Sequence, residues 1–169
     1  MWTLLFPVIC ATYTITQFPE SGPPPDPRIL ITSAFDSNAN QIIFLGGEGL
    51  KGPDDLSSTL YAFNLNTLTW IAIPSKMGFV PQGLKDAKLY FRKLDNKVFV
   101  FGGQTNKGLN TVVYSFDLKR FFWNIEIMNG DVMASTIRAA FTQFSFNGTE
   151  YIAVQGGYSG GGLIDEFYL

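Results

Sequence analysis

The amino-acid sequence predicts an all-β fold of about three four-stranded antiparallel sheets. A run of apolar, strand-forming residues ends in a glycine doublet at three places, whose first glycines, Gly46, Gly102 and Gly156, are 56 and 54 residues apart. A tyrosine follows these glycines after 12 to 15 residues, and a tryptophan follows the first two tyrosines after nine. These landmarks are Tyr61, Tyr114, Tyr168, Trp70 and Trp123. Such a period indicates a chain built from repeated units.

The second unit shows four strands most clearly, because each is short and rich in Val, Phe, Tyr or Trp. Asp95-Asn96 supplies a turn after the first strand, and a polar loop at 104–110 follows the second. Lys119-Arg120 separates the third strand from the fourth. The expected strands are residues 87–94, 97–103, 111–118 and 121–127.

The third unit begins with residues 133–141, whose local sequence also permits a helix. Their alignment with residues 83–91 favours a loop followed by a strand instead. Asn147-Gly148 then predicts a two-residue hairpin turn. The sequence reaches Leu169 within the expected third strand, so we expect the last unit to be truncated.

The glycine doublets follow strands that are apolar on both faces, as at Val98–Phe101. Such a strand belongs to a sheet that is covered on both sides. A β-propeller provides this cover, because each blade packs between two neighbours around a central axis. Glycine permits the backbone angles and close approach needed at the end of an inner strand. We therefore expect each doublet at the end of such a strand.

The repeated pattern resembles the kelch repeat, in which a strand and Gly-Gly are followed by a loop, Tyr and, later, Trp. The matching pieces are "IFLGG…LYAFNLNTLTW" (43–70), "VFVFGG…VVYSFDLKRFFW" (98–123) and "IAVQGG…DEFYL" (152–169), and "PDPR" at 25–28 resembles the opening of a kelch unit. The resemblance implies an incomplete kelch-type β-propeller with units at about 28–73, 84–127 and 138–169. It also implies that further blades, or another chain, are needed to close the ring.

The first eleven residues are apolar and uncharged in their side chains, which fits a signal peptide and a core strand equally, and the repeat register, which leaves them no strand position, favours the signal peptide. Counting back by the repeat places residues 12–16 in a fourth-strand slot, with Tyr13 in the tryptophan position. In kelch-like propellers such an N-terminal strand often closes the ring. We therefore expect a secreted or cell-surface protein, and the alternative is a cytoplasmic one.

Composition excludes several functions. The chain has no histidine and one cysteine, which removes histidine-dependent nucleophilic sites, imidazole metal ligands and an internal disulfide. The net charge is −2, which argues against nucleic acid and against a polybasic membrane patch. We expect no cofactor, no metal and no catalytic residues.

Candidate partner-binding residues lie in the loops that follow the doublets. Glu48, Gln104 and Tyr158 occupy one repeated position with different side chains, and such positions are where a propeller diversifies. Other loop candidates are Lys51, Asp54, Asp55 and Lys107. For the acidic residues, ordinary solvated loop charges are the alternative.

Two further features have alternative explanations. Arg28 and Arg138 recur 18 residues before a doublet, where they bond backbone carbonyls between blades or hold an anion. Asn147-Gly148-Thr149 fits the glycosylation pattern, although a hairpin turn already explains Asn-Gly.

The favoured function is a non-catalytic module that binds a protein partner through loops on one propeller face. One alternative is a fragment of a secreted enzyme similar to galactose oxidase, whose copper ligands would have to come from missing blades. Another is a carbohydrate-binding surface protein, because the many aromatic residues permit sugar stacking as well as core packing.

Overall fold

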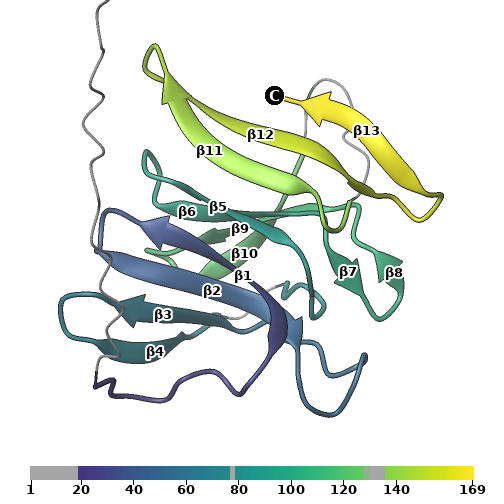
Figure 1. Cartoon of the computed structure of the whole chain (residues 1–169). Helices are drawn as coiled ribbons and strands as arrows, with labels where there is room; N and C mark the ends of the chain where they lie inside the picture. Colours follow the sequence, from purple (N-terminus) through teal and green to yellow (C-terminus); the bar gives the residue numbers. More distant parts are fainter. Residues whose placement is uncertain (1–18, 77–78, 128, 130–135) are drawn as a thin grey trace, which may run out of the picture.

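The computed structural model describes residues 19–76, 79–127, 129 and 136–169. The described chain is all-β and forms three antiparallel sheets stacked side by side, as predicted (Figure 1). It contains no helix that is long and apolar enough to cross a membrane. The expected segments at 1–11 and 12–16 lie outside the described residues.

Sheets 1 and 2 each have four strands, and sheet 3 has three. Sheet 1 contains β1 (Ile29–Asp36), β2 (Gln41–Glu48), β3 (Leu60–Asn64) and β4 (Thr69–Ile73). Sheet 2 contains β5 (Lys88–Arg92), β6 (Lys97–Phe101), β9 (Val113–Asp117) and β10 (Phe122–Glu126). Sheet 3 contains β11 (Ala140–Phe146), β12 (Thr149–Tyr158) and β13 (Leu163–Tyr168). A small hairpin of β7 (Gln104–Thr105) and β8 (Gly108–Leu109) forms within the expected polar loop of the second unit.

The three units are equivalent in register. In each sheet the tyrosine of the third strand pairs with the residue two positions before the first glycine of the doublet. The pairs are Phe44–Tyr61, Val100–Tyr114 and Val154–Tyr168. The doublets therefore mark the ends of interior strands that have partners on both sides.

The glycine doublets lie where one sheet meets the next. A Cβ at Gly102 would lie 2.5 Å from the carbonyl oxygen of Thr136, and a Cβ at Gly46 would come closer still to that of Leu84. The following amides, of Gly47 and Gly103, donate hydrogen bonds of 2.8 and 3.0 Å to those same two carbonyls. Only a residue without a side chain allows this approach, so the doublets connect consecutive sheets.

The main core lies between sheets 1 and 2. Ile43 and Leu45 of sheet 1 meet Val98, Phe116 and Trp123 of sheet 2, and all are buried. The Phe116 and Trp123 rings pack edge to face with centroids 5.0 Å apart. Burial of these large rings against aliphatic side chains stabilises the stack.

The register corrects the expected equivalence of the two arginines. In each sheet the residue directly before the doublet pairs with a residue of the first strand. These pairs are Thr32–Leu45, Lys88–Phe101 and Ala140–Gln155. The two paired residues are two positions further apart along the chain in the third unit than in the first two. Thr136, and not Arg138, therefore corresponds to Arg28. Arg138 corresponds to Leu30 and Asp86, and all three have a positive φ.

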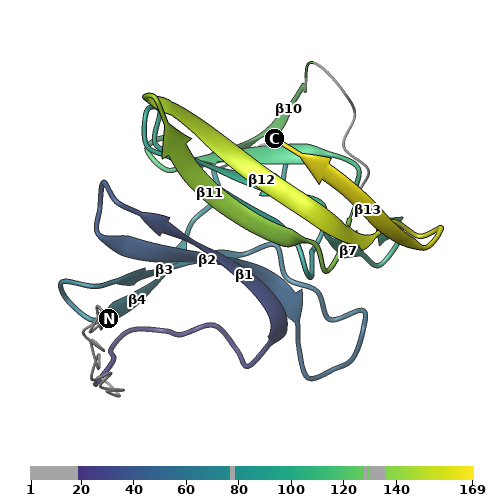
Figure 2. The ribbon, with the colours of Figure 1, turned by 45° about the horizontal axis from the view of Figure 1, so that its top comes forward.

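The stack of sheets is open. Figure 2 shows sheet 1 and sheet 3 at its two ends, and the two core clusters place sheet 2 between them. Sheet 2 contacts sheet 3 through a smaller cluster of Tyr90, Phe99 and Phe101 with Phe141 and Ile152. This cluster lies on the first two strands of each sheet, together with Val113 of β9.

Candidate functional site

Three loops gather at the end of the stack where the doublet strands finish, on the right in Figure 1. They are residues 49–59 after β2, residues 102–112 with the β7–β8 hairpin, and residues 159–162 after β12. The opposite end carries the short turns 37–40, 93–96 and 147–148. Because equivalent strands run in the same direction in each sheet, equivalent loops emerge together.

The structure places Glu48, Gln104 and Tyr158 at one equivalent position, as the sequence indicated. They pair across the backbone with Ile29, Lys85 and Ile137, respectively. Their side chains differ in role. The carboxylate of Glu48 forms a 2.6 Å ion pair with Lys85 of the next unit, whereas the hydroxyl of Tyr158 donates a 3.2 Å hydrogen bond to the carbonyl of Gly160.

Asp55 and Arg28 hold the first loop in place. The guanidinium of Arg28 lies 3.4 Å from the Asp55 carboxylate and donates 2.9 and 3.3 Å hydrogen bonds to the carbonyls of Asp55 and Gly47. The amide of Lys51 donates a 3.3 Å hydrogen bond to the Asp55 carboxylate. Asp55 therefore has a structural role, while the Lys51 and Asp54 side chains face solvent.

Asn110 holds the second loop, and the sequence interpretation missed it. Its buried side-chain amide donates hydrogen bonds of 2.9 and 2.7 Å to the carbonyls of Gly102 and Val112. Lys107 lies at the tip of the hairpin and is exposed. The available signal was an Asn at the end of a loop, where its amide can satisfy free backbone groups.

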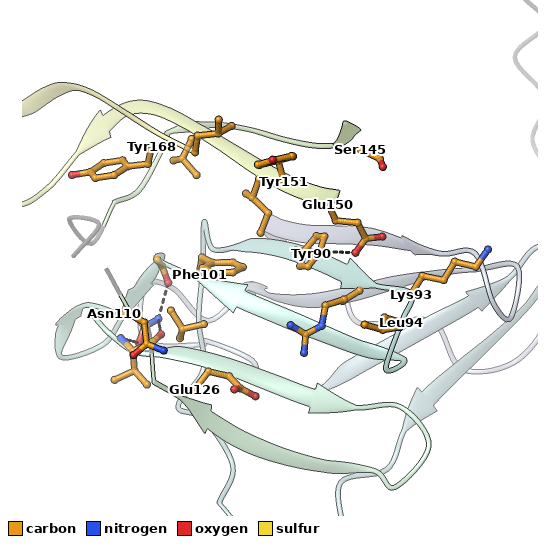
Figure 3. A pocket seen from close by; sticks show the side chains of 18 of the residues that line it. Tyr90, Lys93, Leu94, Phe101, Asn110, Glu126, Ser145, Glu150, Tyr151 and Tyr168 are labelled. Atoms are coloured by element: carbon orange, nitrogen blue, oxygen red, sulfur yellow. Dashed lines mark hydrogen bonds between the residues drawn. The ribbon is translucent and has the colours of Figure 1, made fainter. Parts of the chain in front are cut away.

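A cleft of about 1400 Å³ lies between sheet 2 and sheet 3 (Figure 3). None of the seven candidate loop residues, all of which the structure describes, lines it. Its walls are mostly apolar and aromatic, and they include Tyr90, Phe101, Val113, Ile152, Val154 and Tyr168.

Charged groups gather at one end of the cleft. The hydroxyl of Tyr90 donates a 2.5 Å hydrogen bond to the carboxylate of Glu150, which joins the two sheets (Figure 3). Burial, reinforced by this hydrogen bond and the negative charge of Glu150, raises the pKa of Tyr90. The phenol therefore stays protonated well above neutral pH.

Arg92 forms a second polar contact at this end. Its guanidinium donates hydrogen bonds of 2.9 and 2.6 Å to the two carboxylate oxygens of Asp95, and it lies 4.4 Å from the ring centroid of Phe99. These hydrogen bonds lower the pKa of Asp95 and raise that of Arg92. The pair is thus fixed in its charged form.

The first junction of the stack explains the cleft. Ile152 lies four residues before its doublet, as Val98 does, and Val98 pairs with Phe116 on the third strand. Between sheets 1 and 2, Phe116 and Trp123 fill the space beside that position. In the described part of sheet 3, β13 ends before it reaches Ile152. The cleft therefore corresponds to space that aromatic side chains occupy in the other junction.

The described residues include no cluster of three Asp, Glu or Cys side chains that could hold a metal ion. Every buried side-chain nitrogen or oxygen in this part of the chain has a hydrogen-bond partner. Among the charged groups of the loops and the cleft, Glu48, Asp55, Arg92 and Asp95 form ion pairs.

Residues 4–169 match the family described as the KLHDC2/KLHL20/DRC7 Kelch-repeats domain. The chain belongs to the kelch-repeat family. This confirms the resemblance drawn from the Gly-Gly, Tyr and Trp pattern. Kelch-repeat domains are in general protein-interaction modules and are typically non-catalytic. A search of curated proteins found no match to this chain.

Proposed function

We propose that this kelch-repeat chain is a non-catalytic module that binds a protein partner through the three loops at one end of the stack. One observation carries the proposal: side-chain hydrogen bonds and ion pairs hold the first two loops in place, yet these loops present charged side chains to solvent. Binding residues are often found on loops that a rigid scaffold positions.

The fixed part of this surface consists of ion pairs and side-chain hydrogen bonds. Arg28–Asp55 ties the first loop to the strand that precedes it, and Asn110 ties the base of the β7–β8 hairpin. These groups already order the loops in the free protein. Binding a partner therefore does not incur the conformational entropy cost of ordering them.

The exposed part of the surface carries both signs of charge and an apolar side chain. Lys51, Asp54 and Lys107 are exposed, and Leu50 is 86% exposed. Mixed charge around an apolar contact is typical of a transient protein interface and steers association.

Affinity capture with the full chain as bait tests this proposal. The test variant combines Lys51→Glu, Asp54→Lys and Lys107→Glu. The matched control changes exposed charges at the opposite end, Lys93→Glu and Lys119→Glu. We expect the test variant to lose proteins that wild type and control both retain. Equal capture by all three baits would overturn the loop assignment. Glycan binding or oxidase turnover in place of protein capture would overturn the proposed class of function.

We also propose that the protein is secreted or displayed at the cell surface. Support comes from the apolar first residues and from Asn147, which lies exposed in the turn between β11 and β12 with φ 50°. Expression in a eukaryotic secretory host tests this: we expect an N-terminus cleaved near Ala11 and a mass loss on treatment with an N-glycosidase. An uncleaved chain retained in the cytoplasm would contradict it.

A further inference from the structure

Among the described residues, each of the two terminal sheets has one apolar face that no other sheet covers. We define the leading face of a sheet as the one that carries the fourth-strand tryptophan, and the trailing face as the other. On sheet 1 the leading face includes Phe35, Phe44, Phe63 and Trp70. On sheet 3 the trailing face includes Phe144, Tyr151 and Phe167.

The junction between sheets 1 and 2 shows what these faces do when they meet a partner. There the leading face of sheet 2 packs on the trailing face of sheet 1. Phe91 of the packed leading face is 3% exposed, whereas Phe35, at the equivalent position on sheet 1, is 52% exposed. Leu60 of the packed trailing face is 2% exposed, whereas Phe167, its equivalent on sheet 3, is 59% exposed. Large side chains thus stay in water where their equivalents form the core.

The first glycine of the third doublet, Gly156, retains a geometry that its described surroundings do not require, whereas a Cβ at Gly157 would lie 2.8 Å from the carbonyl oxygen of Ile137. Gly156 and Gly157 have φ of 65° and 108°, in the left-handed region that the first two doublets also adopt. At Gly46 and Gly102 a carbonyl of the next unit lies where a Cβ would be. At Gly156 the nearest atom is 3.3 Å away and belongs to Ile164 of the same sheet. In the described chain, no backbone carbonyl of a following unit lies beside Gly156, as those of Leu84 and Thr136 lie beside Gly46 and Gly102. In the first unit, the position equivalent to Leu84 and Thr136 is Arg28, at the other end of the stack.

The side chains beside the open doublet also match those at the other end. Between sheets 1 and 2 the position after the doublet forms the Glu48–Lys85 ion pair. The equivalent residues at the two free ends are Tyr158 and Ile29, which are 39% and 64% exposed. Both are apolar or aromatic, so they complement each other and would leave no unpaired charge in a junction.

We propose that the trailing face of sheet 3 in one chain binds the leading face of sheet 1 in a second copy. The contact repeats the internal junction between sheets 1 and 2, with the carbonyl of Arg28 received at the third doublet. It is a heterologous, head-to-tail contact, which closes into a ring when the second copy returns the same contact. This contact includes Tyr158, which adjoins the loop 159–162, but none of the exposed charged residues Lys51, Asp54 and Lys107.

The mass of the full 169-residue chain in solution, measured by light scattering after size exclusion, tests this proposal. The variants are Phe35→Lys on the leading face and Phe167→Lys on the trailing face. Leu94→Lys, in the turn 93–96 where Leu94 is 91% exposed, is the matched control. We expect the wild type and control to form a dimer, and each face variant to weaken it by at least about tenfold.

An equimolar mixture of the two face variants identifies the direction of the contact. Each mixed pair retains one intact junction, formed by the trailing face of Phe35→Lys and the leading face of Phe167→Lys. We therefore expect the mixture to dimerise more tightly than either variant does alone. Circular dichroism checks that each variant is folded, and Phe35→Ser replaces Phe35→Lys if it is not. A wild type that stays monomeric up to about 100 μM would overturn the proposal. A dimer insensitive to both variants, or no recovery on mixing, would overturn it as well.

Discussion

The amide of Gly47 in sheet 1 donates a 2.8 Å hydrogen bond to the carbonyl of Leu84, which opens the second unit. Gly46, beside it, leaves no room for a Cβ next to that same carbonyl. The doublet therefore contacts the next unit as well as ending a strand of its own sheet. The equivalent contact of Gly103 with Thr136 shows that this arrangement is repeated.

Gly46→Ala should destabilise the fold by about 2–4 kcal/mol, because the new Cβ meets a backbone carbonyl at a φ of 78°. Gly52→Ala is the control, since Gly52 also has a positive φ but no atom within 4 Å of its Cβ position. It should cost about 1 kcal/mol from backbone strain alone. Urea unfolding measures both, and equal losses would show that the close approach is unimportant.

The Glu48–Lys85 ion pair should couple the first two units. It is part-buried, so a double-mutant cycle of Glu48→Gln and Lys85→Met should give a coupling free energy of about 0.5–1.5 kcal/mol. The coupling should fall in high salt. Additive single effects would mean that the pair contributes nothing to the junction.

Acid should destabilise the chain through Asp95. Hydrogen bonds from Arg92 lower the pKa of Asp95 in the folded state, so its contribution is present above the ordinary value of 3.8. It is lost as the pH falls through the lowered value. Urea unfolding from pH 6 to pH 2 measures this, and Arg92→Met should show a weaker dependence on pH in that range. An unchanged profile would contradict the assignment.

Alkali should act through Tyr90. Its pKa is raised by burial and by Glu150, so the neutral phenol contributes stability that is fully present below pH 10 and is lost as the pH rises through the raised value. Tyr90→Phe keeps the ring but removes the hydrogen bond to Glu150, and should cost about 1 kcal/mol at pH 7. Its stability should also fall less between pH 10 and pH 12 than that of the wild type. A steeper fall in the variant would refute this role for Tyr90.

Much of the fold could be predicted because its landmarks have direct physical causes. Glycine is required where two backbones meet, and Tyr114 and Trp123 are buried at the junction with sheet 1. The glycine doublet and the tyrosine recur in all three units, and the tryptophan in the first two, so the period appears in the sequence. The turn at Asn147-Gly148 was predictable for a similar reason, because both residues have a positive φ.

The register of the third unit could not be counted from the sequence. The turn at 147–148 has two residues where the others have four, and its strands extend further on both sides. A fixed offset of 18 residues from the doublet therefore selects Arg138, although the pairing selects Thr136. Pairing depends on which strands lie side by side, which a residue count does not contain.

The sequence could not show which of the candidate residues have a structural role and which are exposed for binding. Glu48 and Asp55 are charged like Lys51 and Asp54, but the structure places Glu48 at the end of β2 and both Glu48 and Asp55 in ion pairs. Their partners, Lys85 and Arg28, are 37 and 27 residues away along the chain. The cleft beside Ile152 was also unpredictable, because it depends on how two sheets pack against each other.

Hydrogen–deuterium exchange of the chain with a captured partner tests the central claim most directly. The account predicts slower exchange at residues 49–59, 102–112 and 159–162 on binding, with the turns 37–40 and 93–96 unchanged. Protection confined to those turns, or no protection at the loops, would contradict the claim that this end of the stack is the protein-binding surface.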